Sequence, residues 1–368
     1  MNIAEAETTP LVKLLARRWR LGEEVGDCRF DRAGGRLAFV LGDGTLALAS
    51  MDDPESAQAR WRVALDTGRA SIAPRRRPVP PLMRLLADVA PLRVAPFGAE
   101  GFIVGGASGR LVRVAPDGTT AVLVEIDTGA VDAIEPLPDH SALVAAGGVV
   151  VRYDAGGGTA RALAHMEGPL RALAAAPDGD HVALATPDAV AVIGLRDAGR
   201  TDLALARAQV LAWSPDGQRL AIGLTEGGLA LLDMEDGRVL RLPDYPAPIR
   251  SLDWSADGSQ LVTGGAFRTI VWDMAEPGDR PRTIETGRAG MVTVEVVRRH
   301  PRRPLVAVGY EDGSIVIARI GHRDELLLRE PSAGQVEDLR WSGDGEHLAF
   351  TTAQGELGVI DLPPHMFK

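Results

Sequence analysis

The residues best suited to chemistry in this chain are charged side chains on short apolar stretches that recur along the sequence. They are Asp132, Glu135, Arg171, Arg250, Asp253, Glu295, Glu337 and Asp338. Carboxylates that converge on one point bind metal ions or transfer protons. Successive side chains of a strand point to opposite sides, so the sequence leaves open which of these groups face one another.

Histidine, cysteine and glycine patterns give no further support for catalysis. The seven histidines form no HxH or HExxH pair, and the single cysteine, Cys28, has no internal disulfide partner. The glycine-rich stretches at 105–109 and 156–158 read as hairpin turns, without the following helix that a phosphate-binding loop needs. We therefore predict no catalytic, cofactor-binding or metal-binding residues, and a protein that is not an enzyme.

The elements that carry these charges belong to a repeated unit. Its clearest copies are LAWSPDGQRLAIG at 211–223, SLDWSADGSQLVTG at 251–264 and DLRWSGDGEHLAFT at 338–351. Each copy is an apolar stretch, a turn containing Asp-Gly, and a second alternating stretch, which is typical of two antiparallel strands. Trp213 and Trp254 lie 41 residues apart, and a period of ~40 to 45 residues is that of a four-stranded propeller blade.

Weaker copies at 26–40, 91–105, 131–145 and 170–185, with a degenerate one around Val297, bring the count to eight units. The last unit ends after its third strand at Asp361, whereas residues 16–21 form an unpaired strand before the first unit. Pairing the two would remove two exposed sheet edges. We predict an all-β fold: one closed β-propeller domain over residues 1–368, with eight four-stranded blades, seven being the alternative, and a short tail at 363–368.

One unit resembles the WD40-repeat family. Thr263-Gly264-Gly265 followed by the strand 269–273, which ends in Trp272-Asp273, matches the WD-repeat pattern, and His165 stands where that family places the His of a Gly-His pair. The other units lack the full Trp-Asp ending. The resemblance implies a divergent bacterial WD40 scaffold for protein interactions. The TolB-like propellers, whose repeats also read WSPDG, are a second resemblance.

Composition is consistent with a soluble, turn-rich β protein. Hydrophobic residues make up 45% of the chain, which has 42 Gly and 25 Pro. A net charge of -10 argues against general binding to nucleic acid or to an anionic membrane. The acidic N-terminus lacks the features of a secretory signal, and no apolar run is long enough to span a membrane. We expect a cytoplasmic monomer.

The main break in the repeat is a basic, proline-rich segment at 66–90, which we interpret as an insertion between the first two blades. Residues 59–63 then form the outer strand of the first blade, and 82–86 form a helical turn. Such junctions share a face with the turns between second and third strands, which we call the upper face. Long ordered insertions often bind partners, so Arg75, Arg76 and Arg77 are candidate contacts, and changing all three to Ala should barely alter stability.

Further candidate contacts lie on upper-face turns and junctions, where exposed aromatic and arginine side chains anchor interfaces. They are Tyr245, Phe267, Arg268, Arg288 and Tyr310. A second basic cluster, Arg298 to Pro304, is expected on the opposite face as a solvated turn. We predict a non-enzymatic scaffold with a protein partner on the upper face. The alternative is a propeller that binds a small molecule or metal in its central channel.

Overall fold

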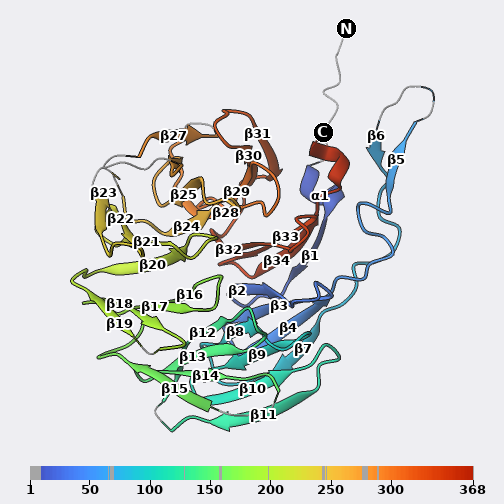
Figure 1. Ribbon diagram of the computed structural model, residues 1–368. Helices are drawn as coiled ribbons and strands as arrows, with labels where there is room; N and C mark the ends of the chain where they lie inside the picture. The colour runs from blue at the N-terminus through green and yellow to red at the C-terminus, as the bar shows by residue number, and fades with distance from the viewer. Residues whose placement is uncertain are drawn as a thin grey trace.

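The computed structural model describes residues 10–64, 66, 70–127, 129–156, 160–197, 199–242, 245, 247–275, 281–287 and 290–367. Within these ranges, eight four-stranded antiparallel sheets form a ring (Figure 1). In seven of these sheets, the strands follow one another in chain order from the centre outward. The prediction of eight blades is confirmed. In the described part of the chain, no helix is long and apolar enough to cross a membrane.

Each blade runs from an innermost strand to an outer one. Blade 1 contains β2 (Val25–Phe30), β3 (Arg36–Leu41), β4 (Thr45–Ser50) and β7 (Met83–Leu86). Blade 2 contains β8 (Arg93–Pro96), β9 (Phe102–Gly105), β10 (Arg110–Val114) and β11 (Thr120–Glu125). Blade 3 contains β12 (Val131–Pro136), β13 (Ala142–Ala146), β14 (Val149–Tyr153) and β15 (Ala160–His165). Blade 4 contains β16 (Ala172–Ala175), β17 (His181–Ala185), β18 (Val190–Gly194) and β19 (Arg200–Leu203).

The second half of the ring repeats this plan. Blade 5 contains β20 (Ala208–Trp213), β21 (Arg219–Leu224), β22 (Leu229–Asp233) and β23 (Val239–Leu242). Blade 6 contains β24 (Ser251–Trp254), β25 (Gln260–Gly264), β26 (Thr269–Asp273) and β27 (Thr283–Thr286). Blade 7 contains β28 (Val294–Arg299), β29 (Leu305–Tyr310), β30 (Ile315–Arg319) and β31 (Glu325–Arg329). Blade 8 contains β32 (Val336–Trp341), β33 (His347–Thr352), β34 (Glu356–Asp361) and β1 (Ala16–Arg20).

Hydrogen bonds within the repeated Trp-Ser-x-Asp-Gly turn stabilise its conformation. In blade 5, the Ser214 hydroxyl donates to the Asp216 carboxylate and accepts a hydrogen bond from the Arg219 amide, at 2.6 and 2.9 Å. Gly217 has a φ of +69°, a left-handed conformation that glycine adopts without strain. The turn therefore ends one strand and starts the next after a fixed number of residues.

The repeated tryptophan joins neighbouring blades. The indole nitrogens of Trp213, Trp254 and Trp341 donate to the backbone oxygens of Ala174, Ala212 and Arg298, at 2.9 to 3.0 Å. Each acceptor lies on the first strand of the preceding blade. The apolar cores also lie between blades, as in the cluster that contains Val192 of blade 4 and Trp213 of blade 5. The repeat thus encodes the contacts between blades as well as the blades themselves.

The N-terminal strand closes the ring, as predicted. β1 pairs with β34 from Ala16 opposite Ile360 to Arg20 opposite Glu356. The preceding helix α1 (Leu11–Leu15) places Leu15 in the same core as Leu362. The C-terminal residues form a 3-10 helix, η1 (Pro364–Phe367), so the predicted tail is ordered against the ring. The Arg303 guanidinium donates to the backbone oxygen of Phe367 at 2.9 Å and covers its ring.

The predicted outer strand of blade 1 is wrong. Residues 83–86, expected to be a helical turn, form that strand as β7, paired with β4 from Thr45 opposite Leu86 to Leu48 opposite Met83. The segment 61–63 instead forms β5 (Trp61–Val63) in a separate hairpin with β6 (Ala70–Ile72). Both segments satisfy the strand pattern, but only the later one reaches the free edge of β4.

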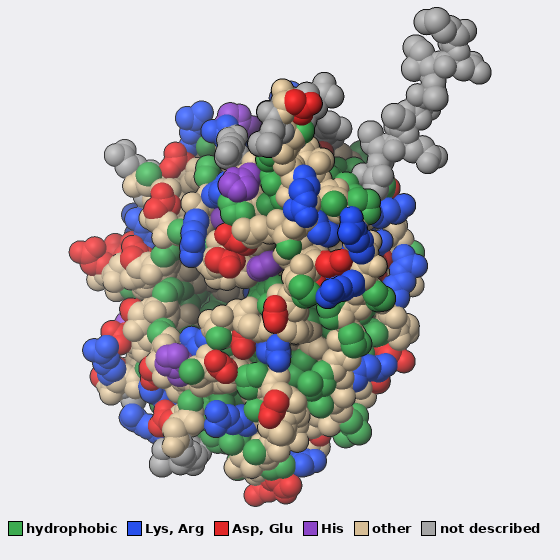
Figure 2. All heavy atoms as spheres, turned by 90° about the vertical axis from the view of Figure 1, so that its right-hand side faces the viewer, with side chains coloured by type: hydrophobic (Ala, Val, Ile, Leu, Met, Phe, Trp, Pro, Cys, Tyr) green, Lys and Arg blue, Asp and Glu red, His purple; other side chains and the backbone are tan. Residues whose placement is uncertain are grey.

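This changes the place of the insertion, which is the connection from β4 to β7 and lies within blade 1. Because strands alternate in direction, this connection leaves from the face that carries the turns between first and second strands, which we call the lower face. Figure 1 shows the β5 and β6 hairpin projecting beside the ring, and Figure 2, which looks onto that side, shows Lys and Arg side chains gathered there. The predicted junction position at 66–90, and with it the upper-face location, is corrected.

Candidate functional site

The insertion makes hydrogen bonds to blade 8 and to α1 where blades 8 and 1 meet. The Ala57 amide donates to the Asp361 carboxylate at 3.0 Å, and the Arg60 guanidinium donates to the backbone oxygen of Leu14 at 2.6 Å. The Trp19 indole donates to the Pro80 oxygen at 2.9 Å. These contacts join the insertion to the last blade and to the closing strand, which gives it a structural role.

The three arginines of the insertion, Arg75, Arg76 and Arg77, differ in burial and in their contacts. Arg75 donates two hydrogen bonds of 2.8 Å to the carboxylate of Asp53, whose side chain is fully buried. Arg76 and Arg77 are exposed, and their backbone amides donate to Glu55. Arg75 is therefore a structural residue, which contradicts the expectation that all three could be replaced without loss of stability.

Two of the predicted upper-face residues remain available for contact. Phe267, in the turn between β25 and β26, exposes 51% of its surface, and the neighbouring Arg268 forms an ion pair with Glu285. Met291, in the junction between β27 and β28, is 88% exposed and was not predicted. The Val294 amide donates to the Ala266 oxygen at 2.9 Å, which holds this junction beside the Phe267 turn.

Tyr245 and Tyr310, also predicted as contacts, are not free surface groups. Tyr245 is 4% exposed, and Tyr310 is half-buried at the end of β29. Burial raises the pKa of Tyr310 to about 12. Arg288 lies outside the described residues. Both tyrosine rings are turned into the protein because burial of apolar surface is favourable.

Tyr245 instead completes a hydrogen-bonded group inside blade 6. Its hydroxyl accepts a hydrogen bond from the Ala266 amide at 3.2 Å and interacts with Thr263. The Trp272 indole also donates to the Thr263 hydroxyl, at 3.1 Å. The unit with the Trp-Asp ending thus has a Tyr, Thr and Trp network, whereas the side chain of His165 is exposed.

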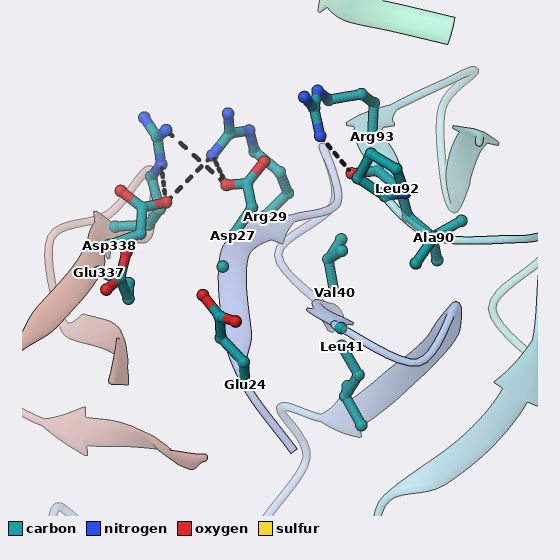
Figure 3. A pocket seen from close by; sticks show the side chains of 14 residues that line it. Glu24, Asp27, Arg29, Val40, Leu41, Ala90, Leu92, Arg93, Glu337 and Asp338 are labelled. Atoms are coloured by element: carbon teal, nitrogen blue, oxygen red, sulfur yellow. Dashed lines mark hydrogen bonds and ion pairs between the residues drawn. The ribbon is translucent and has the colours of Figure 1, made fainter. Parts of the chain in front are cut away.

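The central channel holds a cluster of paired charges from β2, β28 and β32. Asp338 accepts hydrogen bonds from Arg298 at 3.0 Å, Arg340 at 2.9 Å and Arg29 at 3.2 Å. Arg29 also pairs with Asp27. Figure 3 shows Asp27, Arg29 and Asp338 converging beside a cavity of about 700 Å³, which Glu24, Arg93 and Glu337 also line.

The channel environment shifts several carboxyl groups. Burial alone would raise the pKa of Asp338, but the guanidinium groups of Arg340, Arg298 and Arg29 hold it well below its usual range. Burial raises the pKa of Asp27 and of Asp253. Burial also raises the pKa of Glu135 to about 7. Of the charged residues predicted to line the channel, Asp253, Glu337 and Asp338 line its cavities.

These carboxylates are arranged for ion pairing. Among the described residues, no group of three or more His, Cys, Asp or Glu side chains is placed to hold a metal ion. Asp338 accepts hydrogen bonds from three arginines, which stabilise its ionised form and make it a weak base. The thiol of Cys28 is buried against Asp338, and burial raises its pKa well above the usual value.

Glu135→Gln should stabilise the protein at high pH. The pKa of Glu135 is about 7 in the folded state, above the ordinary 4.5, so the folded state binds the Glu135 proton more tightly than the unfolded state does. Stability contributed by the neutral form is complete below pH 4.5 and is lost as the pH rises through 7. Because Glu135 is only half-buried, we expect the variant to gain about 1 kcal/mol at pH 8 and nothing at pH 4. Urea unfolding of both proteins across this range is the measurement, and parallel profiles would contradict it.

Parts of the chain are similar in sequence to WD-repeat proteins. A family model described as the anaphase-promoting complex subunit 4 WD40 domain matches residues 200–257 and 299–364. COMPASS component SWD3 of Saccharomyces cerevisiae is 25% identical over 160 residues, which cover 41% of this chain and 50% of that protein. Human WD repeat-containing protein 55 is 26% identical over 156 residues, covering 42% and 39%. The chain thus matches half or less of the length of these relatives.

A solved structure is similar over nearly the whole ring. Sqt1 of Chaetomium thermophilum superimposes with a TM-score of 0.71 at 17% identity, covering 94% of this chain and 97% of that one. The ring of four-stranded sheets defines a β-propeller. The matches to WD-repeat proteins support a WD40 β-propeller, as the Trp-Asp unit indicated.

Proposed function

We propose that this protein is a non-enzymatic scaffold that binds a protein partner through its upper face. Support for a protein partner comes from relatives whose names place them in assemblies, among them a COMPASS component. The similarity to WD-repeat proteins and the pairing of Asp338 with three arginines favour a scaffold over an enzyme. On the sequence alone, we also propose that it is a cytoplasmic monomer.

The observation that carries the choice of face is the pair Phe267 and Met291. Large apolar side chains this exposed favour burial in an interface. Aromatic, methionine and arginine residues are enriched at interface centres, and Arg268 stands beside Phe267. We define these three residues as the Phe267 patch.

The test is affinity capture of the tagged protein from its native lysate, with quantitative mass spectrometry. The Phe267→Ala, Met291→Ser double variant should lose a protein that the wild type retains near stoichiometry. The matched control is the pair Val122→Ala, Leu123→Ala on the outer strand β11, where both side chains are exposed by 49% and 38%. Equal retention by the wild type and the Phe267 patch variant would refute the proposed face, and absence of any specific protein would refute the scaffold.

A further inference from the structure

A second cavity opens at the lower end of the channel, where blade 7 lacks the tryptophan of blades 5, 6 and 8. Strand β28 ends in Arg299, at the position that Trp213, Trp254 and Trp341 occupy in their own blades. Each of those tryptophans ties its blade to the preceding one through the indole nitrogen. Arg299 has no indole, and its backbone amide donates instead to the Asp253 carboxylate at 2.7 Å.

The cavity formed there is lined mainly by cationic and aromatic groups. It has a volume of about 380 Å³, and its walls include Trp254, Trp341, Arg298, Arg299 and Arg340. Asp253 and His300 also line it. Burial, together with Arg303, lowers the pKa of His300 to about 4, so this imidazole is neutral at pH 7 and does not add to the charge. Three guanidinium groups and one carboxylate line the cavity, and Asp338, outside the lining, pairs with two of the three guanidinium groups.

Arg299 differs from the other channel arginines in its pairing. Arg298 and Arg340 both bind Asp338, whereas the Nε and Nη1 atoms of Arg299 are buried and have no hydrogen-bond partner among the described residues. The Nε atom of Arg298 is unpartnered in the same way. Burial lowers the pKa of both Arg298 and Arg299, which is the expected effect of removing a cation from water without full compensation.

We propose that this lower channel cavity is a binding site for a small oxyanion, either a phosphate or a carboxylate group, held by Arg299 with Arg298 and Arg340. A guanidinium group matches the geometry of both anions, because its N–H donors are arranged as a planar fork. A cavity of this size holds a metabolite-sized molecule, and the indole rings of Trp254 and Trp341 offer apolar walls to the rest of it. The site is distinct from the Phe267 patch, which lies on the opposite face.

The test uses inorganic phosphate and acetate as separate probes, titrated calorimetrically into the full chain at constant ionic strength, with chloride as the reference. We expect saturable binding of at least one probe in the millimolar range or tighter, and the stronger probe assigns the anion class. Arg299→Gln should bind it about tenfold more weakly, as expected for loss of a charge-assisted hydrogen bond. Its melting temperature without the probe should stay near that of the wild type, because the Nε and Nη1 atoms of Arg299 make no hydrogen bond there.

Arg299→Trp gives a sharper form of the test. It introduces the residue that blades 5, 6 and 8 have at this position, fills the cavity and brings an indole to the backbone of the preceding blade. The ring should therefore remain folded while probe binding is abolished. The matched control is Arg302→Gln in the following turn, which removes one exposed charge outside this cavity and should bind as the wild type does. The proposal is overturned if the wild type binds neither probe beyond chloride, if Arg299→Trp binds equally well, or if Arg302→Gln loses as much affinity as Arg299→Gln.

Discussion

Arg75→Ala should lower the free energy of unfolding by about 2 kcal/mol, because it leaves a buried carboxylate short of partners. The Asp53 side chain is inaccessible to water and takes two hydrogen bonds from Arg75. What remains is the Glu55 amide at 3.0 Å and the Arg17 guanidinium at 3.6 Å. Removing one partner of a buried ion pair often costs more than about 2 kcal/mol. Here Arg17 still neutralises part of the Asp53 charge, so the expected loss is smaller.

The matched control for this prediction is Arg76→Ala. Arg76 is the next residue, is exposed, and contacts Glu55 through its backbone amide, which alanine keeps. Its stability should change by less than ~0.5 kcal/mol. Chemical unfolding of both variants measures the difference. If the two variants unfold at the same denaturant concentration, the Arg75 and Asp53 pair contributes nothing to stability, and the prediction is wrong.

The repeat made most of the fold predictable, because each unit carries its own strands and turn, and three units also carry the inter-blade tryptophan. The outer strand of blade 1 was missed for a physical reason. Two segments, 61–63 and 83–86, have strand-forming sequences, and the choice between them depends on which one the chain can bring to the edge of β4. Spacing along the sequence does not contain that information, since the intervening residues are anchored by contacts to blade 8.

The channel cluster was missed in part, although a signal for it exists. Asp27-Cys28-Arg29 in the first unit and Asp338-Leu339-Arg340 in the last have the same Asp-x-Arg pattern at equivalent positions of the innermost strand. These units are more than 300 residues apart and become neighbours only because the ring closes. The prediction of closure therefore implied that the two patterns meet, and the ion pairs from Arg29 and Arg340 to Asp338 are the result.

Arg75 and Tyr245 show where residue type misleads. Arginine in a proline-rich basic segment and tyrosine in a junction are both typical of surfaces, yet both side chains make contacts inside the protein here. Arg75 neutralises the buried Asp53, and Tyr245 packs near Trp272 in a blade that has no histidine at that place. Exposure is a property of the assembled ring, so sequence patterns predict it less well than strand positions.

Deleting residues 1–20 should have the largest effect on the protein, because these residues supply the last strand of the ring. The deletion removes β1, and with it the five residue pairs to β34 and the buried side chains of Leu15 and Arg17. Burial of one leucine alone stabilises by ~2 kcal/mol, and loss of a buried arginine that neutralises Asp53 adds more. We expect a loss of about 5 kcal/mol or more, which is a large part of the stability of a typical protein.

The same deletion should also change the assembly state. Without β1, the backbone groups of β34 form an unpaired sheet edge, and such edges pair with other chains. Light scattering after size exclusion should therefore detect oligomers or aggregates of the 21–368 chain. The control is deletion of residues 1–9, which keeps every described contact of α1 and β1 and should unfold as the full chain does.

Rescue separates a missing strand from a general folding defect. A synthetic peptide of residues 10–21, added in excess, should occupy the vacant edge beside β34 and raise the unfolding midpoint of the 21–368 chain, since strand addition recovers the same backbone pairs. A peptide in which Arg17 is replaced by Ala should restore less, because Asp53 then keeps one cationic partner fewer. A truncated chain that stays monomeric with an unchanged midpoint would show that the ring is held by seven complete blades and that the closing strand is dispensable.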